Sequence, residues 1–258
     1  MTALVALLAA VAPTEDGFRT AIPADWLQGR TAYGGLSTAL AYHAATACAP
    51  DLSPLRSAQV AFIGPLSGDV TVKASVLRRG RNAAFIQSDV ISEAGLGVRA
   101  TFVFMAAQPS RIALDARPPA GHVPPAKDAK LYTGPAEFFT GNFNFLDLKD
   151  AATSEAEWLR WGRLREREGL DPVTELLAVA DGLPPAAYRL FGKEPVPISS
   201  LTWIVNLLVP LPHTDDGWWL LSANSAFAQQ GCSSQAMRLW NASGELVAEG
   251  MQSVAIFG

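Results

Sequence analysis

Between residues 55 and 107 the chain carries four successive stretches rich in Val, Phe, Ile and Thr. Gly, Pro or charged residues bound each of them, which is typical of strands joined by turns, and no helical periodicity separates them. Adjacent strands joined in this way pair antiparallel, so we predict an antiparallel meander. The stretches read "RSAQVAFIGPL", "DVTVKASVLRRG", "NAAFIQSDVISEAG" and "GVRATFVFMAA".

The last third of the chain repeats this pattern. Four further strand candidates read "ISSLTWIVNLLVPL", "GWWLLSANSAFA", "GCSSQAMRLWNASG" and "ELVAEGMQSVAIFG". An earlier window, "SEAEWLRWGRLRERE", fits both a helix and a strand. Because Trp158 and Arg160 alternate with Leu159 and Trp161, we favour a strand there.

A helix is expected before each meander. In residues 35–48, Leu36, Leu40 and His43 fall at helical spacing, and the other faces are Ala, Ser and Thr rather than charged. Such a helix is surrounded by protein, and its length of about 20 Å matches the width of a sheet wrapped around it. The second helix, in "DPVTELLAVADGLPP", is expected to be capped by Asp171. A long antiparallel sheet curled around one apolar helix is the hotdog arrangement.

The two halves match in the order of their elements and in the positions of their turns. The segment 109–130 separates them, carries five prolines and shows little periodicity, as expected for a linker. We therefore predict an α+β fold of two tandem hotdogs, residues 1–108 and 131–258, with the two sheets pairing side by side.

Composition narrows the class of protein. The 258 residues include 20 Lys and Arg against 24 Asp and Glu, a net charge of −4, and no basic run that could track phosphates. Nucleic acid is therefore not an expected partner. No window approaches the roughly 20 apolar residues that a membrane span needs. The three histidines share no metal-ligand spacing, so neither a metal site nor a cofactor is expected.

The opening "MTALVALLAAVAP" lacks a basic region and runs into the acidic "TEDG". We interpret it as a helix that packs on the body rather than as a signal peptide. Cys48 and Cys232 lie far apart and form no C-x-x-C motif. This usage favours a reducing, cytoplasmic location.

Gly34 and Gly35 open the first helix. The first turn of a helix exposes unpaired N–H groups at the positive end of the macrodipole, and without a Cβ atom a ligand oxygen can approach them closely. A thioester carbonyl would be polarised there. The alternative is that the two glycines only form a tight turn.

The same stretch, "GLSTA", also resembles the nucleophile elbow of α/β-hydrolases, with Ser37 as nucleophile. That elbow follows a buried parallel strand, whereas "DWLQGRTAY" is not an apolar run. The strand and helix alternation of a parallel sheet is also missing, so we do not assign this role to Ser37.

Two long segments resemble the acyl-CoA thioesterase II (TesB-like) family. The "YGG" turn with its alanine-rich helix and "VAFIGPLSGDVTVKASVLRRGRNAAFIQSDVISEAG" resemble its first hotdog. "ISSLTWIVNLL", "WWLLSANSAFAQQG" and "GELVAEGMQSVAIF" resemble its second. The resemblance implies a double hotdog, hydrolysis of acyl-CoA thioesters, no metal, and assembly into homo-oligomers, either dimers or tetramers of double hotdogs.

In that family an Asp, a Thr and a Gln hold the attacking water. The resemblance places the Asp on Thr202 and the Thr on Ala226, which Ser225 and Asn224 flank. It places the Gln on Gln252. Only Gln252 keeps the family's residue. The catalytic residues expected on this basis are therefore Gln252, Thr202 and Ser225.

The substrate-binding residues expected are Tyr33, Gly34, Gly35, Asn224, Ala226 and Arg81. Arg81 belongs to a small basic turn that could meet the phosphates of coenzyme A. A solvated hairpin tip is the alternative for this turn.

A missing carboxylate is serious, because that group is the general base. Asp181 and Asp89 are candidate replacements, although a solvated or capping role is the simpler interpretation of each. Two functions follow: an acyl-CoA thioesterase, or a non-hydrolytic protein that binds acyl-CoA or an acyl lipid on the same fold. A hotdog dehydratase would need a histidine near an acid, and His43 is the histidine on the first helix.

Overall fold

The computed structural model describes residues 1–192, 194 and 196–257. Within them, 12 strands form one sheet in the order β1-β2-β6-β7-β8-β5-β11-β14-β13-β12-β10-β9, and every paired neighbour is antiparallel. The strands of the first half are β1 (Ala12–Thr14), β2 (Gly17–Ile22), β5 (Leu55–Phe62), β6 (Gly68–Arg79), β7 (Ala83–Ser92) and β8 (Gly95–Met105). Those of the second half are β9 (Phe143–Asp147), β10 (Glu157–Leu164), β11 (Ile198–Leu207), β12 (Trp219–Gln229), β13 (Cys232–Asn241) and β14 (Leu246–Ile256). A separate small hairpin consists of β3 (Leu27–Gln28) and β4 (Thr31–Ala32).

The strand order reads the same from both ends, as expected for a duplicated unit. The run β6-β7-β8-β5 of the first half is mirrored by β12-β13-β14-β11 of the second. The two runs meet where β5 pairs antiparallel with β11, with Val60 opposite Trp203. The predicted tandem hotdog and the side-by-side pairing of its two sheets are therefore confirmed.

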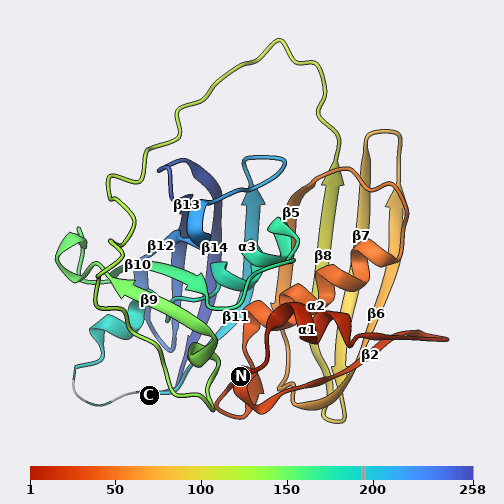
Figure 1. Ribbon diagram of the computed structural model, residues 1–258, viewed down its shortest axis with the longest axis horizontal. Helices are drawn as coiled ribbons and strands as arrows, with labels where there is room; N and C mark the ends of the chain where they lie inside the picture. Colours follow the sequence, from red (N-terminus) through yellow and green to blue (C-terminus); the bar gives the residue numbers. More distant parts are fainter. Residues whose placement is uncertain (193, 195, 258) are drawn as a thin grey trace.

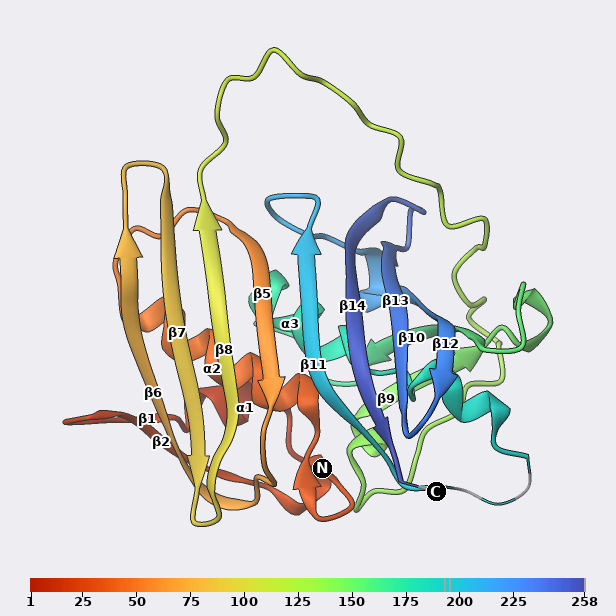
Figure 2. The same cartoon turned by 180° about the vertical axis from the view of Figure 1, so that it is seen from behind.

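The helices all lie on one face of this sheet (Figure 1). They are α1 (Leu4–Ala9), α2 (Gly34–Ala47) and α3 (Pro172–Ala180). Short 3-10 turns are η1 (Ala24–Trp26), η2 (Phe139–Asn142), η3 (Lys149–Ala151), η4 (Ala186–Leu190) and η5 (Asp215–Gly217). Seen from behind, the central strands present a face that no helix covers (Figure 2). None of the described helices is long and apolar enough to cross a membrane.

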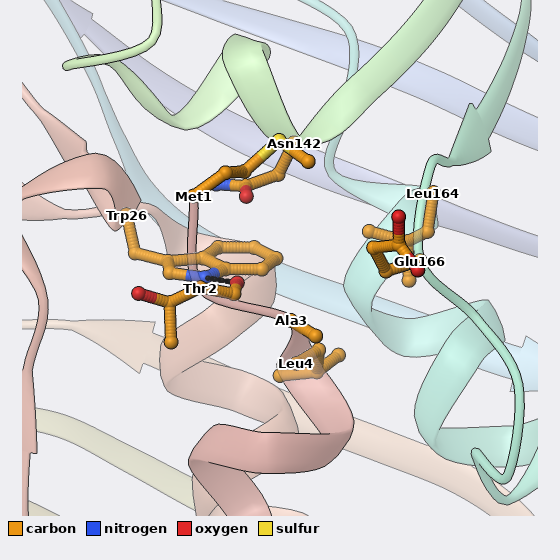
Figure 3. A pocket seen from close by; sticks show the side chains of 8 residues that line it. All are labelled: Met1, Thr2, Ala3, Leu4, Trp26, Asn142, Leu164 and Glu166. Atoms are coloured by element: carbon orange, nitrogen blue, oxygen red, sulfur yellow. Dashed lines mark hydrogen bonds between the residues drawn. The ribbon is translucent and has the colours of Figure 1, made fainter.

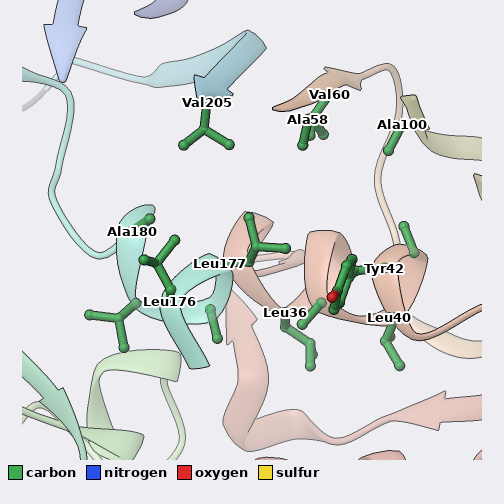
Figure 4. Close-up of a cluster of buried hydrophobic side chains, with 14 of the residues drawn as sticks. Leu36, Leu40, Tyr42, Ala58, Val60, Ala100, Leu176, Leu177, Ala180 and Val205 are labelled. Carbon is green, nitrogen blue, oxygen red and sulfur yellow. The ribbon is translucent and has the colours of Figure 1, made fainter. Parts of the chain in front are cut away.

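The core fills the space between the sheet and the two longer helices. Leu36 and Leu40 of α2 and Leu176 and Leu177 of α3 are each no more than 1% exposed. Figure 4 shows these helices next to each other, with small and β-branched side chains of the sheet facing them. The side chains drawn from the sheet are Ala58, Val60, Ala100 and Val205. Burial on nearly all sides explains why α2 carries so few charged residues.

The first turn of α2 is fastened to the last turn of α3. The Tyr33 hydroxyl donates a 2.8 Å hydrogen bond to the Ala178 carbonyl oxygen. A Cβ atom on Gly35 would approach that same oxygen to 2.5 Å, so only glycine allows the two helices to come this close. The N-terminal end of α2 and the C-terminal end of α3 therefore meet where the two halves join.

Several sequence expectations are resolved by the fold. The ambiguous window 154–168 contains strand β10, and the predicted N-terminal helix is α1, whose Leu4 and Leu7 are buried. The sequence did not predict β1 to β4 or β9, which are short segments of two to six residues. Strands this short have too few positions to show a clear alternation.

The Pro-rich segment runs as an extended loop over one end of the sheet (Figure 1). Residues 106–138 are all described, and none of them lies in a helix or in a strand of the sheet. Tyr132 makes one isolated bridge to Phe145. The exact boundaries at residues 108 and 131 stay a prediction.

Candidate functional site

Three polar side chains form a hydrogen-bonded chain on the helix-facing side of the second meander. Gln252 Nε2 donates to Asp181 Oδ1 at 2.7 Å, and Gln235 Nε2 donates to Gln252 Oε1 at 2.7 Å. The chain ends where Gln235 Oε1 accepts from the backbone N–H of Ala186, also at 2.7 Å. Gln252 is 3% exposed and Gln235 is 1% exposed. Two buried amides and a carboxylate thus satisfy one another.

Strand register and a helix end bring these groups together. Gln235 on β13 and Gln252 on β14 are directly paired, so both side chains point to the same face of the sheet. Asp181 directly follows Ala180, the last residue of α3, and Ala186 opens η4. The end of α3 therefore lies over the two glutamines.

The Gly-Gly start of α2 makes room for the carboxylate. A Cβ atom on Gly34 would lie 2.5 Å from Asp181 Oδ2 and 2.9 Å from the Phe62 ring. The backbone N–H of Gly35 faces the Asp181 carboxylate and lowers its pKa by hydrogen bonding. Because the N-terminal end of a helix carries partial positive charge, α2 offers favourable electrostatics to an anion at this point.

The protonation of Asp181 is balanced between opposing influences. Burial is the largest and raises the pKa of Asp181 to about 7, while hydrogen bonds from Gln252 and Gly35 lower it. Asp181 as a whole residue is half-buried rather than fully buried. A carboxylate with a pKa close to neutral suits general acid–base catalysis, because both protonation states are populated at the operating pH.

Asp181 therefore corrects the sequence interpretation, which favoured a solvated or capping role. Asp181 is the C-cap of α3 by position, but its carboxylate accepts from Gln252. The other candidate, Asp89, forms a surface ion pair with Arg99 at 2.6 Å. Of the two candidate carboxylates, only Asp181 contacts Gln252.

Thr202 does not join this site. It pairs with Ser253 and is exposed, whereas its neighbour Trp203 pairs with Gln252 and is 1% exposed. Successive residues of a strand face opposite sides, so Thr202 points to the outer face of the sheet. The register thus does not bring Thr202 beside Gln252, and the role expected for Thr202 stays a prediction.

The three candidate residues of β12 do not all face the same side of the sheet. Ser225 pairs with Gln235 and faces inward, but two strand spacings, roughly 10 Å, separate it from Gln252. Asn224 pairs with the exposed Ala236 on the opposite face, and Ala226 sits exposed at an irregularity of the ladder. The structure thus does not place Asn224 or Ala226 beside Gln252, and the buried Ser225 hydroxyl has no hydrogen-bond partner among the described residues.

The roles expected for Tyr33 and Arg81 as substrate contacts stay predictions. Tyr33 is 1% exposed and stacks on Phe139 with ring centroids 4.2 Å apart, and burial raises the pKa of Tyr33 well above its usual value. Arg81 is exposed at the turn between β6 and β7. The neighbouring Arg79 donates to the carbonyl of Asp51, beyond the C-terminal end of α2. Gly34 lies at the other end of that helix, about 20 Å away.

His43 lies nine residues into α2 from Gly34, or about 13 Å along the helix axis. The His43 and Phe18 rings lie edge to face with their centroids 6.1 Å apart, and burial lowers the pKa of His43. This placement gives no support to dehydratase chemistry. Among the described residues, no three His, Cys, Asp or Glu side chains converge in a way that could hold a metal ion.

A separate pocket lies around the N-terminal residues (Figure 3). Trp26 Nε1 donates to the Thr2 carbonyl at 2.8 Å, and Asn142 Nδ2 donates to the Asp25 carbonyl at 2.6 Å. Leu4 and Leu164 complete the lining together with Met1, Ala3 and Glu166. None of the residues of the Asp181 chain lines this pocket. Its two hydrogen bonds join the N-terminal segment to Trp26, and the turn at Asp25 to Asn142 of the second half.

Sequence reasoning missed Gln235. Its signal is that Gln235 in "SSQAMRLW" alternates with Met237 and Leu239, on the side of the strand that faces the core. An inward glutamine must find hydrogen-bond partners, because a buried polar group without them costs free energy. That argument marks Gln235 for attention without identifying its partners.

Comparisons with known proteins agree with this architecture. The family model "Acyl-CoA thioesterase N-terminal domain" matches residues 22–105, and "Acyl-CoA thioesterase C-terminal domain" matches residues 114–256. No curated protein matches the sequence.

Several solved structures share the fold. A conserved hot dog fold protein of unknown function from Alicyclobacillus acidocaldarius is similar with a TM-score of 0.84 at 20% identity, covering 100% of this chain and 99% of that one. The tesB protein MAP1729c of Mycobacterium avium subs paratuberculosis has a TM-score of 0.79 at 16% identity, with 100% of both chains covered. The acyl-CoA thioesterase II TesB2 of Mycobacterium marinum has a TM-score of 0.72 at 17% identity, with 96% and 95% covered.

Proposed function

Because the chain belongs to the acyl-CoA thioesterase family, we propose that it hydrolyses acyl-CoA thioesters with Asp181 as the general base. The observation that carries this proposal is the 2.7 Å hydrogen bond from Gln252 to Asp181 at the start of α2. This contact places a carboxylate beside Gln252, the one residue of the family's catalytic set that this sequence keeps.

The reaction would begin with a water molecule hydrogen-bonded to the Asp181 carboxylate. Asp181 takes a proton from this water as the oxygen attacks the thioester carbonyl carbon. The tetrahedral intermediate then collapses, the carbon–sulfur bond breaks, and coenzyme A leaves as a thiolate that takes up the proton. A base with a pKa of about 7 is ionised often enough to accept this proton and acidic enough to return it.

Gln252 holds Asp181 in position. Its Nε2 group donates to Oδ1, and the second oxygen, Oδ2, lies against Gly34, where we place the attacking water. Gln252 is itself held by Gln235 and is therefore rigid. Precise placement of a base accounts for a large part of its effect on rate.

The thioester carbonyl is expected at the first turn of α2. The Gly35 N–H faces Asp181, which leaves the Gly34 N–H as the amide that would polarise the carbonyl oxygen. A thioester carbonyl could also be placed at the start of the second helix, near Pro172 and Val173. This placement is unfavourable, because these residues open α3 and Asp181 follows its end. At 1.5 Å per residue the two ends of α3 are about 13 Å apart.

The alternative function, binding acyl-CoA or an acyl lipid without hydrolysis, rested on the loss of both the family's Asp and its Thr. Asp181 favours hydrolysis, because it offers a carboxylate beside Gln252. Hydrolysis and binding without hydrolysis are separated by one experiment: release of free thiol from acyl-CoAs ranging from acetyl to palmitoyl, with thermal shift on the same panel. We expect turnover by the wild type, and stabilisation by an acyl-CoA without turnover would overturn the proposal.

Two variants test the assigned roles. Asp181→Asn keeps the shape of the side chain and its acceptor oxygen but cannot take a proton, so we expect a loss of about 10²- to 10⁴-fold in kcat. Gln252→Ala should lower the rate at least about tenfold through poorer placement of the base. Asp89→Asn is the matched control, since Asp89 pairs with Arg99 on the surface. Equal rates for Asp181→Asn and Asp89→Asn would remove Asp181 from the mechanism.

The protein's assembly and location remain predictions of the same kind. A homo-oligomer is supported by Ile204 and Met251, which pair on the face that no helix covers and are 44% and 57% exposed. Light scattering of the wild type and of Ile204→Lys would test whether this face is an interface between copies. A cytoplasmic location is supported by Cys48 and Cys232, which form no disulfide.

A further inference from the structure

The hydrogen-bonded chain behind Asp181 has a fixed direction. A backbone N–H can only donate, so the Gln235 atom that meets Ala186 at 2.7 Å must be the carbonyl oxygen. The amino group of Gln235 then faces Gln252, and the Gln252 atom opposite it must be an oxygen. The remaining amino group of Gln252 therefore faces Asp181.

We propose that Gln235 is a positioning residue for the hydrolysis, which turns the Gln252 amide so that its amino group always faces Asp181. This inference rests on the proposed function for its catalytic consequence. Its structural content, the orientation of the Gln252 amide, can be measured independently of any activity.

The orientation matters because the two ends of an amide have opposite effects on a carboxyl group. An amino group donates to a carboxylate and favours the ionised form, whereas a carbonyl oxygen accepts from a protonated carboxyl and favours the neutral form. Without Gln235, the Gln252 amide could turn over whenever Asp181 takes a proton. Gln235 prevents this exchange and so keeps Asp181 more acidic than burial alone would leave it.

Few other groups around Asp181 can donate a hydrogen bond that favours its ionised form. From α2 it meets Gly34 and the Gly35 N–H. Tyr33 donates its hydroxyl hydrogen to Ala178 instead. Arg160 of β10 lies nearby, but its guanidinium is paired with Asp147 and reaches only the carbonyl of Gly182. Within the described residues, Gln252 and Gly35 are thus the two hydrogen-bond donors to this carboxylate.

The first test replaces Gln235 by methionine, which has a similar length but neither donor nor acceptor. We expect the pKa of Asp181 to rise by at least about half a unit, measured by carbon-detected NMR titration of the Asp181 carboxyl group in full-length protein. Gln59→Met, on the exposed side of β5, is the matched control and should leave this pKa unchanged. A folded Gln235→Met protein with an unchanged Asp181 pKa would overturn the proposal.

Kinetics then show whether Gln235 acts through Gln252. In Gln235→Met the acidic limb of the kcat/KM profile should move to higher pH, and kcat/KM at pH 6 should fall about three- to tenfold. In a Gln252→Met background the additional change at Gln235 should have almost no effect, because the side chain through which it acts is gone. Independent, multiplying effects in the double variant would contradict an action through Gln252.

An isosteric variant protects the test against a folding defect in Gln235→Met. Gln235→Glu keeps the size of the side chain and the acceptor for Ala186, but an ionised Glu cannot donate to Gln252. Either Gln252 turns over or the glutamate retains a proton, and both raise the pH at which the site loses its last proton. An ionised glutamate moves the acidic limb to higher pH, whereas a protonated one still donates to Gln252 and adds an alkaline limb where it loses that proton. A pH–rate profile identical to that of the wild type in both limbs would argue against the proposal.

The outcomes for the proposed function and for this inference are distinguishable. A wild-type protein that releases no thiol would end the proposed hydrolysis but leave the NMR comparison intact. A wild-type thioesterase whose Asp181 titrates identically with and without Gln235 would retain the function and remove the positioning role.

Discussion

Gly34 lies directly against Asp181: a Cβ atom at Gly34 would approach Asp181 Oδ2 to 2.5 Å. The two residues come from different halves of the chain, one at the start of α2 and the other just after α3. The same Cβ would also lie 2.9 Å from the Phe62 ring. Glycine is required here by space for the carboxylate rather than by an unusual backbone angle.

Gly34→Ala is therefore expected to displace Asp181 and to lower kcat/KM at least about tenfold, because small misplacements of a catalytic group are costly. Thiol release measures the effect. Gly80→Ala is the control, since the nearest atom to a Cβ there is 3.6 Å away and the turn is exposed. Wild-type activity in Gly34→Ala would mean that Asp181 need not occupy its observed position.

The pKa of Asp181 sets the pH dependence of the reaction. With a pKa of about 7, the base is ionised above neutrality, and kcat/KM should fall as the pH drops below that value. At pH 5 the rate should be about 100-fold below its plateau. A pH–rate profile measures this, with circular dichroism confirming that the protein remains folded. An acidic limb near pH 4, as for an ordinary carboxyl, would show that Asp181 is not the base.

The same shift makes Asp181 a source of instability at high pH. Its pKa is about 7 in the folded protein against the usual 3.8 of an aspartate in the unfolded chain, so the folded state holds the proton more tightly. The free energy of unfolding contributed by this group is therefore greatest below about pH 4 and declines as the pH rises to about 7. Above that value the ionised carboxylate remains buried at a cost.

Asp181→Asn removes this cost. Its free energy of unfolding relative to the wild type should increase between pH 5 and pH 8, by on the order of 2 kcal/mol. Urea unfolding at the two pH values measures the difference. Asp89→Asn, at a surface ion pair, should show no comparable trend. A stability difference for Asp181→Asn that does not change with pH would contradict a raised pKa.

Tyr33 should matter for stability rather than for substrate contact. Tyr33→Phe leaves the buried Ala178 carbonyl without its donor, so we expect a loss of about 1–2 kcal/mol in the free energy of unfolding. Chemical denaturation measures it, and Tyr132→Phe, whose side chain is 52% exposed, is the matched control. Unchanged stability together with a raised KM would return Tyr33 to the substrate site.

Local pattern was sufficient for the repeated architecture. Alternating apolar residues identified both meanders, and the uncharged faces of residues 35–48 identified a helix enclosed by protein. These features depend on neighbours within a few residues, so the amino-acid sequence determines them directly. The mirror-image strand order followed from the duplication.

The site depended on contacts between distant segments. Gln252 and Asp181 are separated by 71 positions, and Thr202 falls on the wrong face of β11 by a single residue. A shift of one residue reverses the direction of every side chain of a strand, so an alignment by likeness alone could not select the face.

The sequence by itself thus determined two hotdog units and a Gly-Gly helix start. It also identified Gln252 as a candidate catalytic residue, but not its partners. Tertiary structure decided which carboxylate meets Gln252, and that Gly34 leaves space for it. It also paired Gln235 with Gln252 through strand register. The physical reason is that periodicity reports only which side of an element is buried, whereas chemistry depends on which buried groups are placed against each other.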